Sequence, residues 1–147
     1  MPQIRHLTPT DHAAALRLYT ELTAPKLVST DPAHFNTLLA HPGTTIWGAD
    51  LNSAICAMVT LHLLPNMTYA GRPYGLIENV VTAEAHRGLG LGRAVMQALA
   101  AHAWQQGAYK LMLLTGTARG AVGFYRALGF DADAKQGMIL RAHPSNS

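Results

Sequence analysis

Residues 87–92 read Arg87-Gly88-Leu89-Gly90-Leu91-Gly92, and they lie between a β-branched apolar run at 77–82 and a helical pattern that begins near Leu91. Glycine lets the backbone come close to an anion and direct several N–H groups at it, and the start of a helix adds a positive dipole end. The stretch therefore predicts a phosphate-binding turn that joins a buried strand to a helix. A strand followed by a crossover helix is typical of an α/β fold with parallel strands.

The positive charge of the chain is concentrated around this turn. From Ala85 to Phe130 there are five Lys or Arg residues and no Asp or Glu, a charge of +5. The rest of the chain carries six basic and eight acidic residues, or −2, which accounts for the total of +3. A multiply phosphorylated ligand is the simplest partner for so cationic a segment.

The spacing of the glycines excludes two well-known nucleotide-binding motifs. A dinucleotide-binding fingerprint needs Gly-x-Gly-x-x-Gly with a later acidic residue, and neither Gly88-x-Gly90 nor Gly90-x-Gly92 continues in that way. A nucleotide P-loop needs Gly-Lys-Ser/Thr, which the chain lacks. The remaining alternative to phosphate binding is a tight turn that only caps the helix.

Length and composition predict one folded domain over residues 1–147. The chain has 147 residues, of which 49% are hydrophobic and 13% charged, a balance typical of a globular protein. The single Cys56 lies in the apolar run 54–59, which favours a buried thiol and a reducing, cytoplasmic location. No signal-like start, membrane-length apolar run or Lys/Arg-rich block is present, so we expect neither a membrane nor a nucleic acid as partner.

Patterning along the chain predicts a mixed sheet with flanking helices. Hairpins join the early strands, and crossover helices join the later ones, which implies parallel pairing there. The expected strands are 3–7, 44–49, 54–64, 74–82, 109–115 and 138–141, with a polar hairpin turn at 50–53. The expected helices are 8–22, 32–41, 91–106 and 121–128, with Gly107 closing the third and residues 65–73 forming a loop.

Two motifs in this order resemble the GNAT family of N-acetyltransferases. The family's acetyl-CoA signature, Arg/Gln-x-x-Gly-x-Gly/Ala after a central strand, is matched by Arg87, Gly90 and Gly92. An aromatic-Tyr pair followed by Gly-Phe is matched by Phe124-Tyr125 and Gly129-Phe130. The resemblance implies an α/β (α+β) fold: a mixed central sheet of six to seven strands, about four flanking helices, and splayed parallel strands that form the acetyl-CoA cleft.

The resemblance also implies transfer of an acetyl group from acetyl-CoA to an amine. The strands at 74–82 and 109–115 would splay apart, and the backbone of Val80, Val81 and Thr82 would bind the pantetheine arm. The coenzyme diphosphate would bind the amides of the turn, with Arg87 and Arg93 as charge partners. Arg119 and Arg126 are candidates for the third phosphate, and a solvated surface charge is the alternative role of each. The expected diphosphate-binding residues are Arg87, Gly88, Leu89, Gly90, Leu91, Gly92 and Arg93.

Two side chains are candidate catalytic groups. Glu78 is a lone acid in the strand beside the proposed thioester site, within an Ile-Glu-x-Val-Val run that related members often carry, and it is the candidate general base. A structural carboxylate is the alternative. Tyr125 is expected to donate a proton or hydrogen bond to the leaving thiolate, or else to serve as a core aromatic.

The sequence also leads to expectations about metal binding, the acceptor and the oligomeric state. No His-x-His or His-x-x-x-His pair occurs, so we expect no metal. The loop 65–73, with Arg72, and the first two helices are expected to line the acceptor site, for a small amine or for a protein or peptide amine. A non-catalytic acyl-CoA-binding sensor is the alternative function, and a homodimer is compatible with the resemblance.

Overall fold

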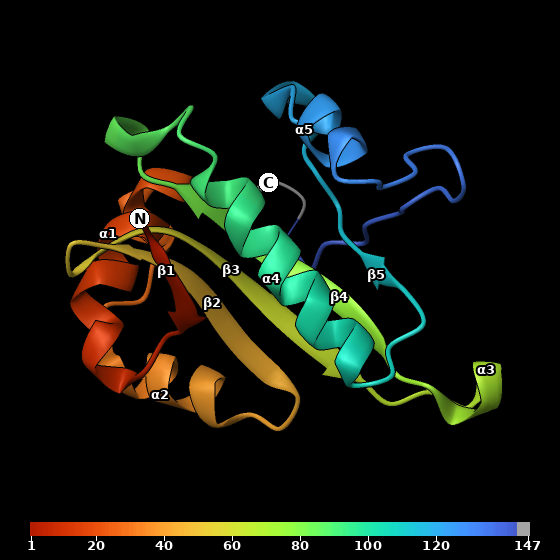
Figure 1. Ribbon diagram of the computed structural model, residues 1–147. Coiled ribbons are helices and arrows are strands. Elements are labelled where there is room, and N and C mark those ends of the chain that lie inside the picture. The colour runs from red at the N-terminus through yellow and green to blue at the C-terminus, as the bar shows by residue number, and fades with distance from the viewer. Residues whose placement is uncertain (144–147) are drawn as a thin grey trace. The chain divides into compact units, whose positions relative to one another are not determined.

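The computed structural model describes residues 1–143 (Figure 1). The chain divides into two compact units, Met1–Leu113 and Leu114–Ser147. The first contains the whole sheet, and the second contains the last helix. A single domain over residues 1–147 stays a prediction.

The sheet of the first unit has five strands in sequence order: β1 (Gln3–His6), β2 (Thr44–Leu51), β3 (Ala54–Leu64), β4 (Tyr74–Thr82) and β5 (Leu111–Met112). The pairs from β1 to β4 are antiparallel, and β4 pairs with β5 in parallel. Hairpins before a parallel crossover are the expected mixed topology, which is confirmed. The turn between β2 and β3 consists of Asn52 and Ser53, which is shorter than the expected turn at 50–53. Both residues have positive φ, as a tight hairpin requires.

Helices cover both faces of this sheet. α1 (His12–Leu22) and α2 (Pro32–Ala40) pack on one face, and α4 (Leu91–Gln105) packs across β2, β3 and β4 on the other (Figure 1). The predicted start signals are used, because the Thr8 N–H donates to the Asp11 carboxylate at 2.8 Å and the Asp31 side chain accepts from the Ala33 N–H. A short 3-10 turn, Pro9–Asp11, separates the first signal from α1.

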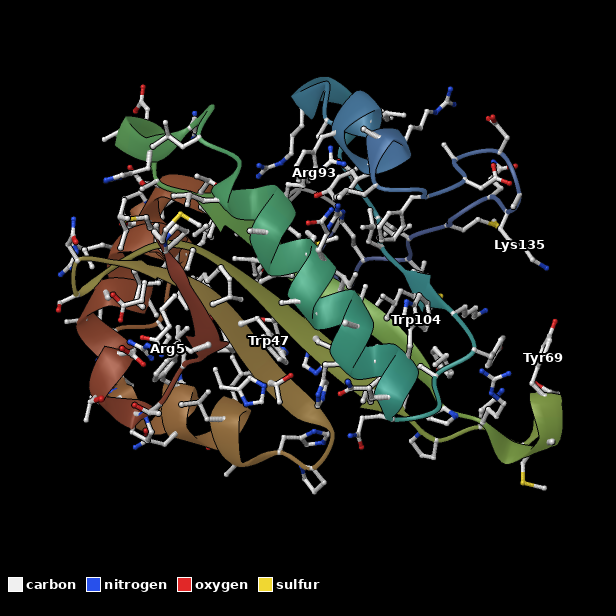
Figure 2. All side chains as sticks on the ribbon, viewed as in Figure 1. Arg5, Trp47, Tyr69, Arg93, Trp104 and Lys135 are labelled. Carbon is white, nitrogen blue, oxygen red and sulfur yellow. The ribbon has the colours of Figure 1, made fainter. Side chains whose placement is uncertain are left out.

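The core lies between the sheet and these helices. One cluster joins α1 and α2 to the sheet through buried residues that include Leu18, Phe35, Ile46 and Met58. Beneath α4, Trp47 of β2 contacts the rings of His6 at 4.1 Å and His102 at 5.3 Å between centroids (Figure 2). Cys56 is buried, as expected from its apolar surroundings.

The loop between β3 and β4 contains an element that patterning missed. α3 (Thr68–Gly71) is a single turn in which Tyr69 and Ala70 have left-handed φ values of 53° and 58°. Arg72 donates to the carbonyls of Gly107 and Ala108, at 3.0 and 3.1 Å. These bonds hold the loop against the end of α4, so Arg72 has a structural role beside the acceptor-site role considered for it.

The sheet is smaller than the expected six to seven strands. β5 covers two residues instead of 109–115, and the predicted strand 138–141 is wrong, because no strand forms there. The apolar pattern of Met138, Ile139 and Leu140 indicated a strand, yet these side chains are 88%, 60% and 101% exposed. Strand formation needs a partner's backbone, which no described residue supplies here. The last helix, α5 (Val122–Ala127), forms as expected, and with α3 there are five α-helices among the described residues where about four were expected.

Candidate active site

A β-bulge lies in the middle of β4. Thr60 of β3 pairs with Glu78, and Met58 pairs with Val81, so Asn79 and Val80 together oppose the single residue between them on β3. Asn79 has a φ of 53°, in the left-handed region. A bulge bends its strand and increases the local twist. The β4–β5 ladder ends two residues before the bulged segment, at the pairs Gly75–Leu111 and Leu76–Met112. The expected separation of β4 from its parallel neighbour is therefore present, and among the described residues β4 runs on to Thr82 with only β3 as a partner strand.

The free edge of β4 exposes backbone hydrogen-bonding groups. The Ala83 N–H donates to the Cys56 carbonyl at 2.8 Å, on the β3 side. Since N–H and C=O groups alternate sides along a strand, those of Thr82 and Val80 are directed to the open edge. Val81 pairs with Met58 and places its side chain in the core. Of the three predicted pantetheine-binding residues, Val80 and Thr82 are thus the ones with backbone groups at the edge.

The glycine turn follows directly and forms an open main-chain cradle. Gly88 and Gly90 have φ values of 80° and 78°, and beyond the adjacent residues no atom of the described chain lies within 4 Å of where a Cβ would stand at either position. Gly90 is the N-cap of α4, and the N–H groups of Gly90 to Arg93 donate to no described residue. Unpaired amides at a helix start are the donors that a phosphate needs, so this turn fits the coenzyme diphosphate.

Two arginines flank the cradle. The Arg87 Nε donates to the Thr82 carbonyl at 3.3 Å, which ties the first arginine of the motif to the end of β4. Arg93 is exposed on the first turn of α4. Their guanidinium groups supply the positive charge at the turn that the sequence predicts.

Glu78 lies on the face of the sheet that α1 covers. Its partner Thr60 pairs in turn with Ile46, a member of the core cluster beneath α1 and α2. Directly opposed residues in neighbouring strands share a face, so the Glu78 side chain lies on that face too, at the start of the bulge. It is exposed, and therefore accessible to solvent and to an acceptor.

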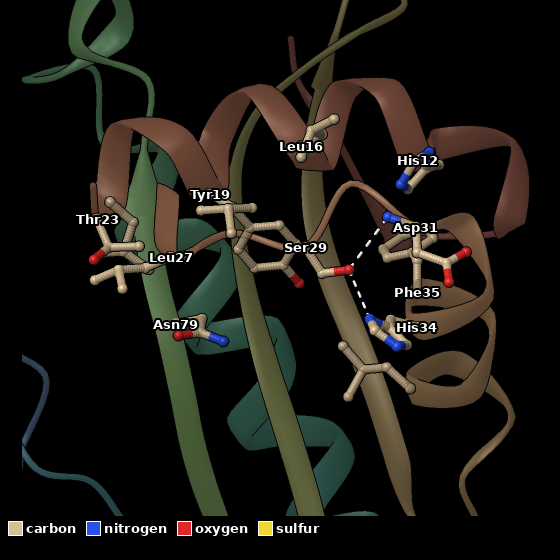
Figure 3. A pocket seen from close by; sticks show the side chains of 13 residues that line it. His12, Leu16, Tyr19, Thr23, Leu27, Ser29, Asp31, His34, Phe35 and Asn79 are labelled. Atoms are coloured by element: carbon tan, nitrogen blue, oxygen red, sulfur yellow. Dashed lines mark hydrogen bonds between the residues drawn. The ribbon is translucent and has the colours of Figure 1, made fainter. Parts of the chain in front are cut away.

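A pocket opens on this same face, between α1, the following segment, α2 and the bulge (Figure 3). Its volume is about 270 Å³. Ser29 Oγ and His34 Nδ1 lie 2.6 Å apart at one side, and Asn79 lies at the other. Figure 3 shows Tyr19 extending from α1 between these two sides. The pocket lining consists of His12, Leu16, Tyr19, Leu22, Thr23, Leu27, Val28, Ser29, Asp31, His34, Phe35, Leu38 and Asn79.

Tyr19 and Asn79 line the pocket but were not found by motif reasoning. The Tyr19 hydroxyl is buried and makes no hydrogen bond of acceptable geometry with a described residue. Burial raises the pKa of the Tyr19 phenol, an effect that the nearby Thr60 hydroxyl partly offsets. A signal for Asn79 was present, because asparagine is unfavourable inside a strand of apolar residues and tolerates left-handed φ.

The remaining predicted residues belong to the second unit. Tyr125, on α5, is half-buried between the rings of Phe124 and Phe130, at centroid distances of 5.1 and 5.9 Å. Burial raises the pKa of the Tyr125 phenol, and the charge of Arg119 partly opposes this. Tyr125 is therefore a neutral hydrogen-bond donor at pH 7. The exposed Arg126 pairs with Asp133 at 3.4 Å. Tyr125 and Arg126 thus lie together in the second unit. Glu78, Arg87 and Arg93 lie together in the first unit, on β4, the glycine turn and α4.

Two further features bear on the predicted partners. Within residues 1–143, no three His, Cys, Asp or Glu side chains gather as a metal-binding group, and a reaction without metal stays a prediction. None of the described helices combines the length and the hydropathy that a membrane span needs.

Comparison with known proteins identifies the family. Residues 7–130 match the model of the acetyltransferase (GNAT) family. Glucosamine 6-phosphate N-acetyltransferase of Trypanosoma brucei brucei is 31% identical over 137 residues, which cover 91% of this chain and 92% of that protein. A putative acetyltransferase from Agrobacterium tumefaciens str. C58 has a similar structure, with a TM-score of 0.88, 42% identity, and coverage of 95% of this chain and 99% of that one. These similarities make the protein an acetyl-CoA-dependent N-acetyltransferase, and the chain belongs to the GNAT family.

Proposed function

We propose that this enzyme transfers the acetyl group of acetyl-CoA to the primary amine of a small molecule, by direct attack through a tetrahedral intermediate. The observation that carries the proposal is the open edge of β4, which follows the bulge at Asn79 and leads into the unpaired amides at the start of α4. Main-chain donors for a thioester and for a diphosphate thus follow one another closely along the chain, from β4 into α4.

The first unit supplies the groups that would hold the diphosphate and the pantetheine arm of the coenzyme. The amides of the turn 88–92 would bind the diphosphate, with Arg87 and Arg93 balancing its charge. The edge groups of Val80 and the N–H of Thr82 would bind the pantetheine arm and the thioester carbonyl. In the second unit, Arg119 and Arg126 are the candidates for the third phosphate. Donors that are fixed before the reaction stabilise the oxyanion of the intermediate, and the loss of one such donor costs about 2.7–4 kcal/mol.

Glu78 is the proposed general base. An alkylammonium group has a pKa of about 10.4, so making it neutral at pH 7 costs roughly 4.6 kcal/mol, and only the neutral amine attacks the carbonyl. Glu78 is exposed on the acceptor face beside the bulge, where it can accept this proton directly or through water and pass it to solvent. The C–N bond then forms as the amine attacks, and the C–S bond breaks as the intermediate collapses.

Tyr125 is the proposed hydrogen-bond donor to the departing thiolate. A phenol of pKa about 10 would lose roughly 2 kcal/mol by giving its proton to a thiolate whose conjugate acid has a pKa of about 8.5. Burial raises the pKa of Tyr125 further, which makes complete transfer less favourable. The hydroxyl therefore stabilises the leaving group by a hydrogen bond, and solvent supplies the proton that completes coenzyme A.

A small acceptor is favoured over a protein amine by two findings. The pocket beside Asn79 is small, at about 270 Å³, and it is bounded by helices instead of forming an extended groove. The curated relative, by its name, acetylates a small amine, glucosamine 6-phosphate. A homodimer and a cytoplasmic location remain predictions.

Calorimetry followed by a thiol-release assay tests the proposal. Acetyl-CoA should bind with measurable heat, and free thiol should then appear faster when a suitable primary amine is added. A panel of small amines, amino acids and peptides separates a small acceptor from a peptide acceptor. Coenzyme binding without faster thiol release for any amine would favour the sensor instead, and absence of binding would refute the proposal.

A further inference from the structure

We propose that the pocket between α1, α2 and Asn79 holds the carbon skeleton of the acceptor, and that the acceptor is a primary amine with an apolar body and no phosphate group. The inference rests on the proposed function and narrows its substrate class. It differs from the substrate in the name of the trypanosomal relative, which carries a phosphate.

The charge of the pocket excludes a phosphate more firmly than any other feature. None of the residues that line it is a Lys or an Arg. Its one carboxylate belongs to Asp31, which accepts a hydrogen bond from the Ala33 N–H at 2.9 Å. A bound phosphate dianion would lose its hydration, gain no strongly cationic partner and be repelled by Asp31. The arginines of the first unit that suit a phosphate flank the glycine turn instead.

Part of the lining is suited to hydrocarbon. Six of the thirteen lining side chains have no polar atoms, and they are contributed by α1, α2 and the segment between them: Leu16, Leu22, Leu27, Val28, Phe35 and Leu38. Burying an alkyl or aryl group against such a wall is favourable in proportion to the apolar area removed from water. The other lining residues carry polar groups, and one of these, the Tyr19 hydroxyl, is buried without a hydrogen bond of acceptable geometry to a described residue.

The position of the pocket connects it to the chemistry. Asn79 is in the bulge and lines the pocket. Glu78 precedes Asn79 along β4 and lies on the face of the sheet where the pocket opens, and Val80 follows Asn79 with its backbone at the open edge of β4. In Figure 3 the Asn79 side chain lies at the opposite side of the pocket from Ser29 and His34. A molecule whose body occupies the pocket and whose amine lies near Asn79 therefore has the candidate base and the candidate thioester site next to that amine.

The volume of the pocket limits the size of the acceptor. At about 270 Å³ it is smaller than the roughly 300–1,000 Å³ of sites for drug-sized ligands. A hexyl chain or a phenylethyl group suits such a space, whereas a peptide does not.

A series of unbranched amines from propylamine to hexylamine tests the inference. Each additional buried methylene should raise kcat/KM by about fourfold until the pocket is full. 2-Phenylethylamine should also be a good substrate, and glucosamine 6-phosphate a poor one. If kcat/KM does not depend on chain length, or if glucosamine 6-phosphate is preferred, the inference is overturned while the proposed function stands. Absence of acetyl-CoA binding would instead refute the proposed function itself.

A pair of variants assigns the effect to this pocket. Leu27 is 62% exposed at the pocket, so Leu27→Arg adds a cation there with little risk to folding. Thr30→Arg is the matched control, because Thr30 is exposed in the same segment but does not line the pocket. Leu27→Arg should lower kcat/KM for hexylamine by about tenfold and leave the Kd for acetyl-CoA unchanged. Equal effects of the two variants on hexylamine would overturn the inference.

Discussion

Replacement of Gly90 by alanine tests the cradle at the start of α4 most directly. Gly90 has a φ of +78°, and an added Cβ would meet no atom within 4 Å. Steric crowding is therefore excluded as a cause of any effect in the free protein. What remains is the left-handed backbone conformation, which costs an L-residue with a Cβ about 1–2 kcal/mol.

This cost must appear either in stability or in coenzyme affinity. If the turn keeps its conformation, the free energy of unfolding falls by about 1–2 kcal/mol, and Tm falls by roughly 2–4 °C for each kcal/mol. If the free turn relaxes instead, acetyl-CoA binding must restore it, and the Kd rises by about five- to thirtyfold. The loss in the free energy of unfolding and the loss in the free energy of acetyl-CoA binding should together amount to about 1–2 kcal/mol. Any steric contact between the new methyl group and the diphosphate would add to the loss in binding.

Calorimetry with acetyl-CoA and urea unfolding measure both quantities on the same samples. Gly123→Ala is the matched control, because Gly123 also has open space around it but lies inside α5 without a positive φ. Alanine is a better helix former than glycine, so this control should gain up to about 1 kcal/mol of stability. If Gly90→Ala behaves like Gly123→Ala in both assays, the left-handed cradle is not what binds the coenzyme.

Three other substitutions give expected outcomes. Tyr125→Phe should lower kcat while the Kd for acetyl-CoA stays constant, and an unchanged kcat in thiol-release assays would remove the assigned role. Glu78→Gln should shift the pH profile of kcat/KM upward, because the amine must then lose its proton to solvent; an unshifted profile would leave Glu78 a structural carboxylate. Asp11→Asn should cost about 1–3 kcal/mol of stability, because both Asp11 oxygens accept from Arg5 at 2.9 Å. That hydrogen bond from Arg5 lowers the pKa of Asp11 below its ordinary value of 3.8, so the contribution is complete above that pH and is lost as pH falls through the folded-state pKa. Urea unfolding at pH 7 and at low pH should show the difference between the two proteins shrinking, and a constant difference would contradict the argument.

The length of the last strands shows where local pattern was insufficient. Residues 54–64 and 74–82 form strands with the expected ends, because each has strand partners along most of its length. The apolar run at 109–115 forms only two residues of strand, and 138–141 forms none. Hydrophobic alternation reports that a segment suits a sheet, but the backbone of a neighbouring segment has to complete its hydrogen bonds.

The candidate site divides in a similar way. Arg87, Gly88, Gly90 and the start of α4 were predictable because a glycine turn before a helix is a local property of consecutive residues. Glu78 was predictable as a candidate from its place in an apolar strand. The first two helices were expected to line the acceptor site, but Tyr19 and Asn79 were not singled out, since nothing in their immediate sequence shows that β4 encloses a pocket together with those helices.

The sequence by itself determined the order of most helices and strands, the glycine turn before α4 and the family to which the chain belongs, because these follow from periodicity and spacing within short segments. Only the tertiary structure decided which backbone groups of β4 are free, on which face Glu78 lies, and what chemistry lines the pocket beside it. Those properties arise from the register of β4 against β3, the early end of its ladder with β5, and the packing of α1 and α2 over the sheet. Each depends on pairing between residues far apart in the chain.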